Sequence, residues 1–237
     1  MKNFLLSNLS KLINFCNNKL SIKIETKSPA QIHLDAVSKD CYEFFKAELK
    51  QSFVFNSDES IRAFAINEAI KKNNNDQLFL EFGVFKGSSI NLFAKFLTKI
   101  KSKIYGFDSF EGLKDEWITS EFNPVGTFNN NKKKPKVLSN VFLIDGWVEN
   151  TLDNFLQKNN EKKISFVHFD MDTYKSTLFV LNKIKKLLIP GSIILFDEFY
   201  GFPNWEKYEY RALIETLEKN KYKYIAFANR QACIEII

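Results

Sequence analysis

The stretch "SFVHFDMDTYKST" at residues 165–177 joins a short apolar run to three polar side chains at every second position. The run has the length and composition of a buried strand, and the residues after Thr173 have the apolar spacing of a helix. If the segment stays extended, His168, Asp170 and Asp172 share one side of it, because strand side chains alternate between faces. Carboxylates where a buried strand ends indicate a ligand site in an α/β sheet.

The same alternation of strand and helix runs along most of the chain. Strands are expected at 77–83, 103–108, 141–146, 164–170 and 192–198. Helices are expected between them at 88–100, 151–160 and 174–188, the last one stopped by Pro190-Gly191. This pattern predicts an α/β protein with a Rossmann-like, doubly wound and mainly parallel sheet.

The two ends of the chain differ from this pattern. Residues 1–75 lack the alternation and are expected to form an N-terminal helical extension, leaving 76–237 as the domain that carries the sheet and the ligand site. The tail at 223–237 has the pattern of a closing strand pair at the sheet edge.

Composition narrows the class of protein. The 237 residues are 45% hydrophobic and 26% charged, with a formal charge of +6. The lysines are scattered in short runs, so we expect no nucleic-acid partner. Three isolated cysteines favour a reducing compartment over a disulfide framework. No apolar run approaches the ~20 residues of a membrane span, so we expect a cytoplasmic protein without stable membrane insertion.

The N-terminal segment has a helical apolar stripe. Leu5, Leu9, Leu12 and Cys16 fall on one face of a helix. Such a stripe suits a membrane surface, but packing against the domain or a second subunit is the simpler interpretation, and a homodimer is therefore possible.

An acidic residue ends each expected strand. Neighbouring strands lie ~4.8 Å apart, so acids at their carboxyl ends converge on one small volume. A single acid there would be explained as the N-cap of the next helix, but five in succession favour a binding site. The five are Glu81, Asp108, Asp145, Asp170 and Asp197.

The segment "EFGVFKGSS" at 81–89 is a strand, a glycine turn and a helix start. An anionic group of a ligand can approach the turn at Gly83 and the helix start at Ser88 and Ser89. The segment is not the dinucleotide fingerprint, because Phe85 stands where a pyrophosphate needs close backbone approach. Glu81 suits an ammonium group and Asp108 suits ribose hydroxyls, and S-adenosylmethionine carries both groups.

Five motifs, in this order and spacing, resemble those of the macrocin O-methyltransferase family. These enzymes are class I S-adenosylmethionine-dependent methyltransferases that act on sugar hydroxyls of natural products and glycans. The resemblance covers roughly residues 55–215. The motifs are "LEFGVFKGSS" (80–89), "GFDSFEGL" (106–113), "IDGWVENTL" (144–152), "HFDMDTYKST" (168–177) and "IPGSIILFDEF" (189–199).

The resemblance implies roles for individual residues. Asp172 matches the family's proposed general base. Asp170, Asp197 and Glu198 match its divalent-metal ligands, although the family usually has aspartate at the position of Glu198. The cofactor contacts expected within the motifs are Glu81, Gly83, Val84, Phe85, Ser88, Ser89, Asp108, Ser109, Phe110, Asp145, Gly146, Trp147 and Asp170, with 145–147 at the adenine end.

The chemistry of methyl transfer fits these residue types. The cofactor supplies the reactive methyl group, and the protein supplies placement. A sugar hydroxyl must lose its proton as it attacks, so Mg²⁺ held by carboxylates can acidify it while Asp172 accepts the proton. His168 is the alternative base. The expected acceptor is a small molecule: a sugar, a nucleotide sugar or a glycoside.

Several alternatives stay open. Residues 121–136 form either a surface loop or a lid whose lysines meet a phosphate. The aromatics of 198–205 either stack on a sugar ring or belong to the core. The whole chain could instead be an NAD(P)-dependent oxidoreductase, or a non-catalytic Rossmann-like partner of a glycan-biosynthesis enzyme.

Overall fold

The computed structural model describes residues 2–19, 27–72, 76–160 and 162–237. The chain divides into two compact units, Met1–Ala36 and Val37–Ile237. Helix α1 (Lys2–Lys19) belongs to the first unit, and α2 (Pro29–Leu49) crosses the division. The boundary expected between residues 75 and 76 stays a prediction.

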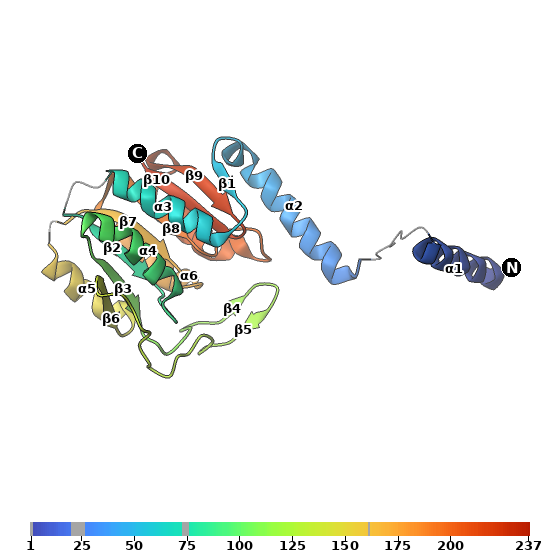
Figure 1. The fold of residues 1–237 in the computed structure, drawn as a ribbon, viewed down its shortest axis with the longest axis horizontal. Coiled ribbons are helices and arrows are strands. Elements are labelled where there is room, and N and C mark those ends of the chain that lie inside the picture. The colour runs from blue at the N-terminus through green and yellow to red at the C-terminus, as the bar shows by residue number, and fades with distance from the viewer. Residues whose placement is uncertain (1, 20–26, 73–75, 161) are drawn as a thin grey trace. The chain divides into compact units, whose positions relative to one another are not determined.

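An eight-stranded sheet forms the centre of the larger unit (Figure 1). Its spatial order is β1-β9-β10-β8-β7-β2-β3-β6, and only β10 runs antiparallel to its neighbours. The prediction of a doubly wound, mainly parallel sheet is confirmed. The strands are β1 (Phe53–Phe55), β2 (Leu78–Phe82), β3 (Ile104–Asp108), β6 (Val141–Asp145), β7 (Ile164–Phe169), β8 (Leu188–Phe196), β9 (Tyr222–Ala228) and β10 (Gln231–Ile236).

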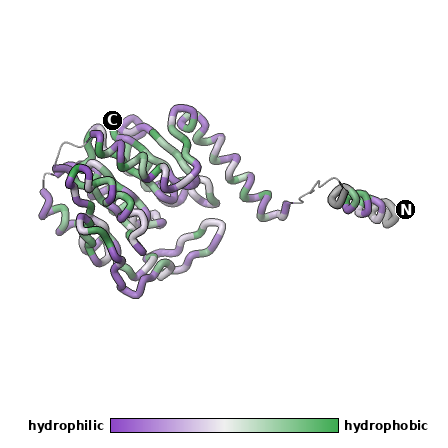
Figure 2. Tube along the Cα trace, viewed as in Figure 1, coloured by the Kyte–Doolittle hydropathy of each residue, from purple (hydrophilic) through white to green (hydrophobic). Residues whose placement is uncertain are grey.

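Helices cover both faces of the sheet. Its central strands are rich in hydrophobic residues (Figure 2), which contribute to two apolar clusters. On β7, Phe166 packs into the core shared with α3 (Asp58–Lys72) and α4 (Ser88–Leu97). Its neighbour Val167 packs into the opposite core, with α5 (Val148–Lys158), α6 (Tyr174–Ile184) and α7 (Glu209–Thr216). Short 3₁₀ turns at Thr98–Ile100, Trp205–Lys207 and Lys219–Lys221 complete the described elements, apart from the small hairpin β4–β5 (Trp117–Ile118 and Phe122–Asn123).

The expected end of one helix at Pro190-Gly191 is wrong. Helix α6 ends at Ile184, and both residues lie inside β8. The pairing of β7 with β8 passes from Ile164↔Leu188 directly to Phe166↔Ile193, so the Pro-Gly pair sits in an irregular stretch of the ladder. Ser192 stabilises this stretch, because its hydroxyl donates to the Ile164 carbonyl at 2.5 Å and accepts from the Ile189 N–H at 2.9 Å.

The outer strands also differ from expectation. The tail forms the predicted strand pair, β9 and β10, but β1 pairs in parallel with β9 and lies outside it. Residues 53–55 are thus a strand within the segment expected to be helical. The sequence of this strand is "FVF", and three residues are too few to show a periodicity.

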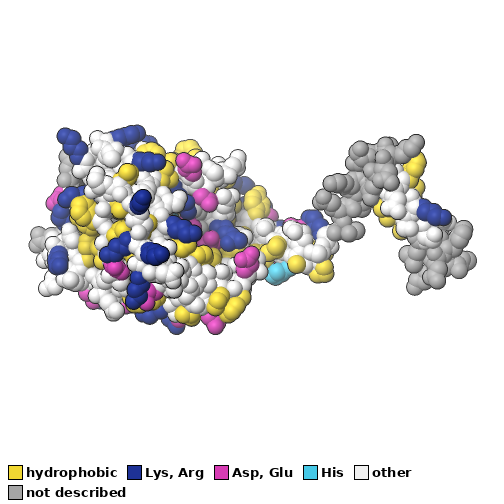
Figure 3. Space-filling view, turned by 60° about the horizontal axis from the view of Figure 1, so that its bottom comes forward, with side chains coloured by type: hydrophobic (Ala, Val, Ile, Leu, Met, Phe, Trp, Pro, Cys, Tyr) yellow, Lys and Arg dark blue, Asp and Glu magenta, His cyan; other side chains and the backbone are white. Residues whose placement is uncertain are grey.

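Among the described residues, no helix combines the length and hydropathy that crossing a bilayer requires. On the face shown in Figure 3, lysines and arginines are interspersed with acidic and apolar side chains. The prediction of a homodimer stays a prediction.

One close approach fixes the turn after β2. Gly83 has a φ of +89°, and a Cβ built on it would lie 1.8 Å from the Asp170 carbonyl oxygen. The Gly83 N–H donates to the Phe107 carbonyl at 2.9 Å, and the Asp170 N–H donates to the Phe82 carbonyl at 2.8 Å. Only glycine lets the ends of β2 and β7 meet in this way.

We therefore expect Gly83→Ala to lower the free energy of unfolding by more than about 3 kcal/mol, because backbone strain and a steric clash add together. Gly126→Ala is the matched control: Gly126 has a similar φ of +84°, but a Cβ added to it would meet nothing within 4 Å. This control should lose only about 1 kcal/mol. Urea unfolding followed by circular dichroism measures both, and equal losses would contradict the close approach.

Candidate active site

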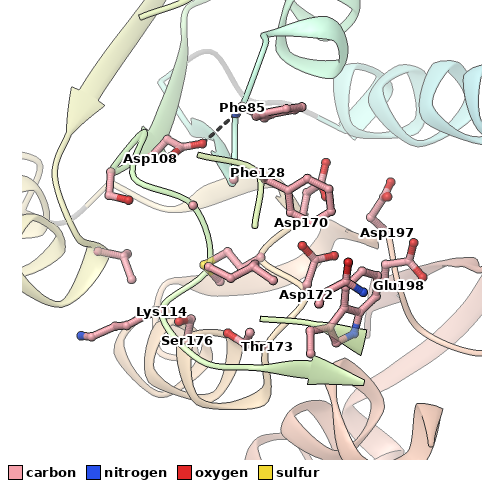
Figure 4. Close-up of a pocket in the computed structure, with 18 of the residues that line it drawn as sticks. Phe85, Asp108, Lys114, Phe128, Asp170, Asp172, Thr173, Ser176, Asp197 and Glu198 are labelled. Carbon is pink, nitrogen blue, oxygen red and sulfur yellow. Dashed lines mark hydrogen bonds between the residues drawn. The ribbon is translucent and has the colours of Figure 1, made fainter. Parts of the chain in front are cut away.

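The carboxyl ends of the central strands open on one cavity of about 580 Å³ (Figure 4). This volume lies in the range of small-molecule sites, about 300–1,000 Å³. The cavity lies beside β2 and β7, the two strands at which the order of the sheet reverses direction. Asp170, Asp172, Asp197 and Glu198 gather at one side of it.

Asp108 holds the glycine turn together. Its Oδ2 accepts hydrogen bonds from the N–H groups of Val84 at 2.8 Å and Phe85 at 2.7 Å. Its Oδ1 accepts from the Phe110 N–H at 2.6 Å. A carboxylate offers about four acceptor positions, so these bonds leave Asp108 room for one more donor from a ligand.

The acids at the strand ends are not helix caps. The N-cap residues of α4, α5 and α6 are Gly87, Trp147 and Thr173, and none of them makes a side-chain capping bond. The explanation of the acids as N-caps is therefore wrong for these three helices.

Glu81 and His168 form a buried polar layer beneath the cavity. Both side chains are fully buried, and Glu81 Oε1 lies 3.3 Å from His168 Nδ1 and also accepts from the Ser89 hydroxyl. His168 Nε2 lies 3.4 Å from Asp197 Oδ1. Burial lowers the pKa of His168, but hydrogen bonds to Asp197 and Glu81 outweigh it and raise the pKa to about 9. His168 is therefore a cation at neutral pH.

Asp197 is paired with cations although it is buried. Arg62 of α3 places Nη2 at 2.5 Å from Asp197 Oδ1, and Gln231 Nε2 donates to the same oxygen. Burial raises the pKa of Asp197, but His168 and Arg62 together bring it below the ordinary value.

Three further carboxyl groups of the cavity, those of Asp170, Asp172 and Glu198, have raised pKa values. Burial raises the pKa of Asp170 well above its ordinary value, and the charge of Asp197 raises it further. Burial, followed by the charges of Glu198 and Asp197, also raises the pKa of Asp172 well above its ordinary value. Burial raises the pKa of Glu198 to about 7, against the lowering effect of Arg230 at 3.3 Å.

The backbone turns sharply at Asp172. Strand β7 ends at Phe169, and Asp172 has a φ of 59°, so the segment is not extended to residue 172. The left-handed conformation is one that aspartate and asparagine adopt more readily than most residues. The expected shared side of His168, Asp170 and Asp172 is thus lost at the third residue.

The structure brings ten of the predicted site residues into the cavity lining. They are Gly83, Phe85, Asp108, Ser109, Gly146, Trp147, Asp170, Asp172, Asp197 and Glu198. The others lie outside the lining: Glu81, Val84, Ser88, Ser89, Phe110, Asp145 and His168. Asp145, on strand β6 beside β3, pairs instead with Lys134 at 3.1 Å.

The segment after β3 contributes lining residues that sequence reasoning missed. Trp117 and Phe128 line the cavity, and the ring of Phe128 packs edge-on against Phe85 at 5.7 Å. The hairpin β4–β5 is anchored by the Tyr208 hydroxyl, which accepts from the Ile118 N–H at 2.9 Å. Irregular segments without periodicity give no sequence signal for such positions.

Two lysines of this segment pair with neighbouring acids. Lys132 lies 3.4 Å from Glu111, and Lys134 pairs with Asp145. The cations that line the cavity are Lys114 and Arg230, both of which were missed. Arg230 lies in the turn between β9 and β10, far from the other motifs in sequence.

The aromatic run at 198–205 belongs to the core. Phe199, Phe202 and Trp205 are at most 4% exposed, and none lines the cavity. Phe199 and Trp205 pack around Phe45 of α2. The interpretation of these rings as core is confirmed, and the sugar-stacking alternative is not supported by their position.

This sheet order, with an antiparallel β10 beside β8 and a ligand cavity at the reversal point, defines a class I methyltransferase fold. A family profile for a methyltransferase domain matches residues 80–199, which is half of the chain. The chain belongs to this methyltransferase family, and its cofactor is S-adenosylmethionine. The family prediction is confirmed, and membership favours methyl transfer over the hydride transfer of an oxidoreductase.

Solved structures show the same fold. The calicheamicin methyltransferase CalS11 superposes with a TM-score of 0.62 at 21% identity, covering 89% of this chain and 94% of that one. The O-methyltransferase NovP superposes with a TM-score of 0.51 at 16% identity, covering 87% and 99%. No curated protein matches the chain in sequence.

The buried position of His168 leads to a stability prediction. His168→Gln leaves the carboxylates of Glu81 and Asp197 without their shared cation, so we expect the free energy of unfolding at pH 7 to fall by about 3 kcal/mol or more. His33→Gln is the matched control, because His33 is exposed on α2 and is the other histidine of the chain. Chemical denaturation measures both variants, and a His168→Gln protein no less stable than the control would contradict the paired layer.

Proposed function

We propose that the chain transfers the methyl group of S-adenosylmethionine to a hydroxyl of a sugar or glycoside. One observation carries the proposal: the glycine turn at Gly83 and the acidic segment Asp170–Asp172 line the same cavity and touch through their backbones. A cofactor and a hydroxyl acceptor can therefore meet within one cavity.

The lining fits S-adenosylmethionine by charge and shape. Acidic side chains outnumber the cations Lys114 and Arg230, and each of these cations is itself ion-paired, with Glu149 at 3.2 Å and with Glu198. A sulfonium and an ammonium are favoured in such a cavity. Asp108 has an acceptor position left for a ribose hydroxyl, and Trp147 offers a ring at the adenine end.

The position of Glu81 changes one expected role. Because Glu81 is fully buried and outside the lining, we propose that Asp170, rather than Glu81, faces the ammonium group of the cofactor. Glu81 then acts through His168 and Ser89, which it contacts.

A divalent cation fits the donor set of the cavity. Asp170, Asp197 and Glu198 supply the hard carboxylate oxygens that Mg²⁺ prefers. Burial, with the charge of Asp197, raises the pKa of Asp170 and of Glu198, and a bound cation would offset both effects by favouring the ionised carboxylates. When bound, Mg²⁺ would lower the pKa of an acceptor hydroxyl. A second group, Glu81, His168 and Asp170, also offers three ligand atoms within 4.8 Å of one another.

Asp172 is the proposed proton acceptor. It lines the cavity, and its raised pKa makes it a stronger base than an exposed carboxylate. His168 is less suited to this role, because it lies outside the lining and is already protonated at neutral pH.

The acceptor class rests on the neighbours. CalS11 is described as a TDP-rhamnose 3'-O-methyltransferase of calicheamicin biosynthesis. Two of the four lysines in 121–136, Lys132 and Lys134, pair with acids. We therefore propose that recognition relies mainly on the sugar hydroxyls and less on a phosphate held by this segment.

The cofactor assignment has a direct test. S-adenosylhomocysteine should raise the midpoint of thermal unfolding, because it binds the folded state alone, whereas NAD should not. Asp108→Ala should reduce the shift. Stabilisation by NAD and not by S-adenosylhomocysteine would overturn the proposal.

Changing Asp170 or Asp172 to asparagine should lower turnover for two different reasons. Asp172→Asn keeps a residue that tolerates the left-handed backbone but loses the proton acceptor, so turnover should fall by roughly 10²–10⁴-fold and excess Mg²⁺ should not restore it. Asp170→Asn removes an anionic ligand, so excess Mg²⁺ should partly restore turnover.

Release of S-adenosylhomocysteine, measured against a panel of nucleotide sugars and simple glycosides, reports both effects. Full activity of Asp172→Asn would exclude Asp172 as the base. Activity of the unmodified enzyme that is indifferent to EDTA would exclude the metal.

A further inference from the structure

Arg62 contacts an acidic residue of the cavity lining, Asp197, from a helix that carries none of the sequence motifs. It lies on α3, and its Nη2 is 2.5 Å from Asp197 Oδ1. The two side chains are 19% and 15% exposed, so the pair is largely shielded from water. Shielding makes this ion pair stronger than a surface pair.

The oxygen that Arg62 contacts is already crowded. Asp197 Oδ1 also accepts from Gln231 Nε2 and lies 3.4 Å from His168 Nε2. Among the described residues, the side-chain hydrogen bonds of this carboxylate all fall on Oδ1. Within the part of the chain that the structure describes, Asp197 therefore has only Oδ2 free to bind a metal ion, because the acceptor positions of Oδ1 are taken by N–H donors.

The charge of Arg62 also opposes a metal ion. A guanidinium stays protonated at any physiological pH, so its positive charge is not lost when a metal ion binds. It acts electrostatically on Asp170 as well as on Asp197, so two of the three expected metal ligands feel its positive charge. A divalent cation bound there would be repelled by Arg62.

We propose that Arg62 competes with a divalent cation for Asp197 and so limits the metal affinity of the site. The inference rests on the metal part of the proposed function. Arg62 already compensates part of the negative charge of Asp170 and Asp197. A metal ion is therefore attracted only by the negative charge that remains.

Binding of Mn²⁺ to the full chain, saturated with S-adenosylhomocysteine, tests this directly by electron paramagnetic resonance. Arg62→Gln should bind Mn²⁺ at least about tenfold more tightly, because one positive charge is removed near the carboxylates. The matched control is Lys71→Gln on the same helix, which removes the same charge from an exposed pair with Glu68. The control should bind Mn²⁺ as the unmodified chain does.

A second variant, Arg62→Lys, tests the proposal even if Arg62→Gln does not fold. Arg62→Lys keeps the charge but reaches less far, so Mn²⁺ affinity should rise in the same direction by a smaller factor. An increase in either soluble variant, absent in the control, supports the proposal. Unchanged or absent Mn²⁺ binding in the soluble variants overturns it. Binding of S-adenosylhomocysteine separates that failure from failure of the methyltransferase proposal, because it does not depend on Mn²⁺ affinity.

Discussion

The concentration of carboxylates at the ends of β7 and β8 is the constraint on which the site depends. Like charges at this spacing repel one another unless cations sit between them. Arg62, His168 and Arg230 supply such cations from three different elements. Against the effect of burial, His168 and Arg62 lower the pKa of Asp197, whereas burial, followed by the charges of neighbouring carboxylates, raises the pKa of Asp170 and of Asp172.

Because strand side chains alternate between faces, the residues that stabilise the strand ends are not the residues that line the cavity. Glu81 and His168 lie on the side of the sheet that α3 and α4 cover, where Ser89 donates to Glu81 and Phe93 packs edge-on against His168. The residues that follow the strands, beyond the last ladder pair, turn into the cavity instead. The buried layer therefore fixes the strand ends, and the residues just past them face the ligands.

The central strands were predictable because their apolar runs are bounded by acids and turns. All five expected strands are found, with ends shifted by a few residues. β1 was not predictable, since three residues show no period, and neither was the irregular ladder at Pro190, which depends on Ser192 and the partner strand. Local sequence indicates an element, but its ends are decided by tertiary pairing.

The candidate site was predictable only where its residues lie in the motifs. Residues that follow strands, such as Asp170 and Asp197, reach the cavity as expected. Glu81 and His168 do not, because they pair with each other inside the ladder between β2 and β7 and are fully buried there. Arg62 and Arg230 were invisible, since each comes from an element far away in sequence and is brought in by the fold. The number of basic and acidic side chains is known from the sequence. Which carboxylate pairs with which cation is decided by the packing of α3 and of the β9–β10 turn.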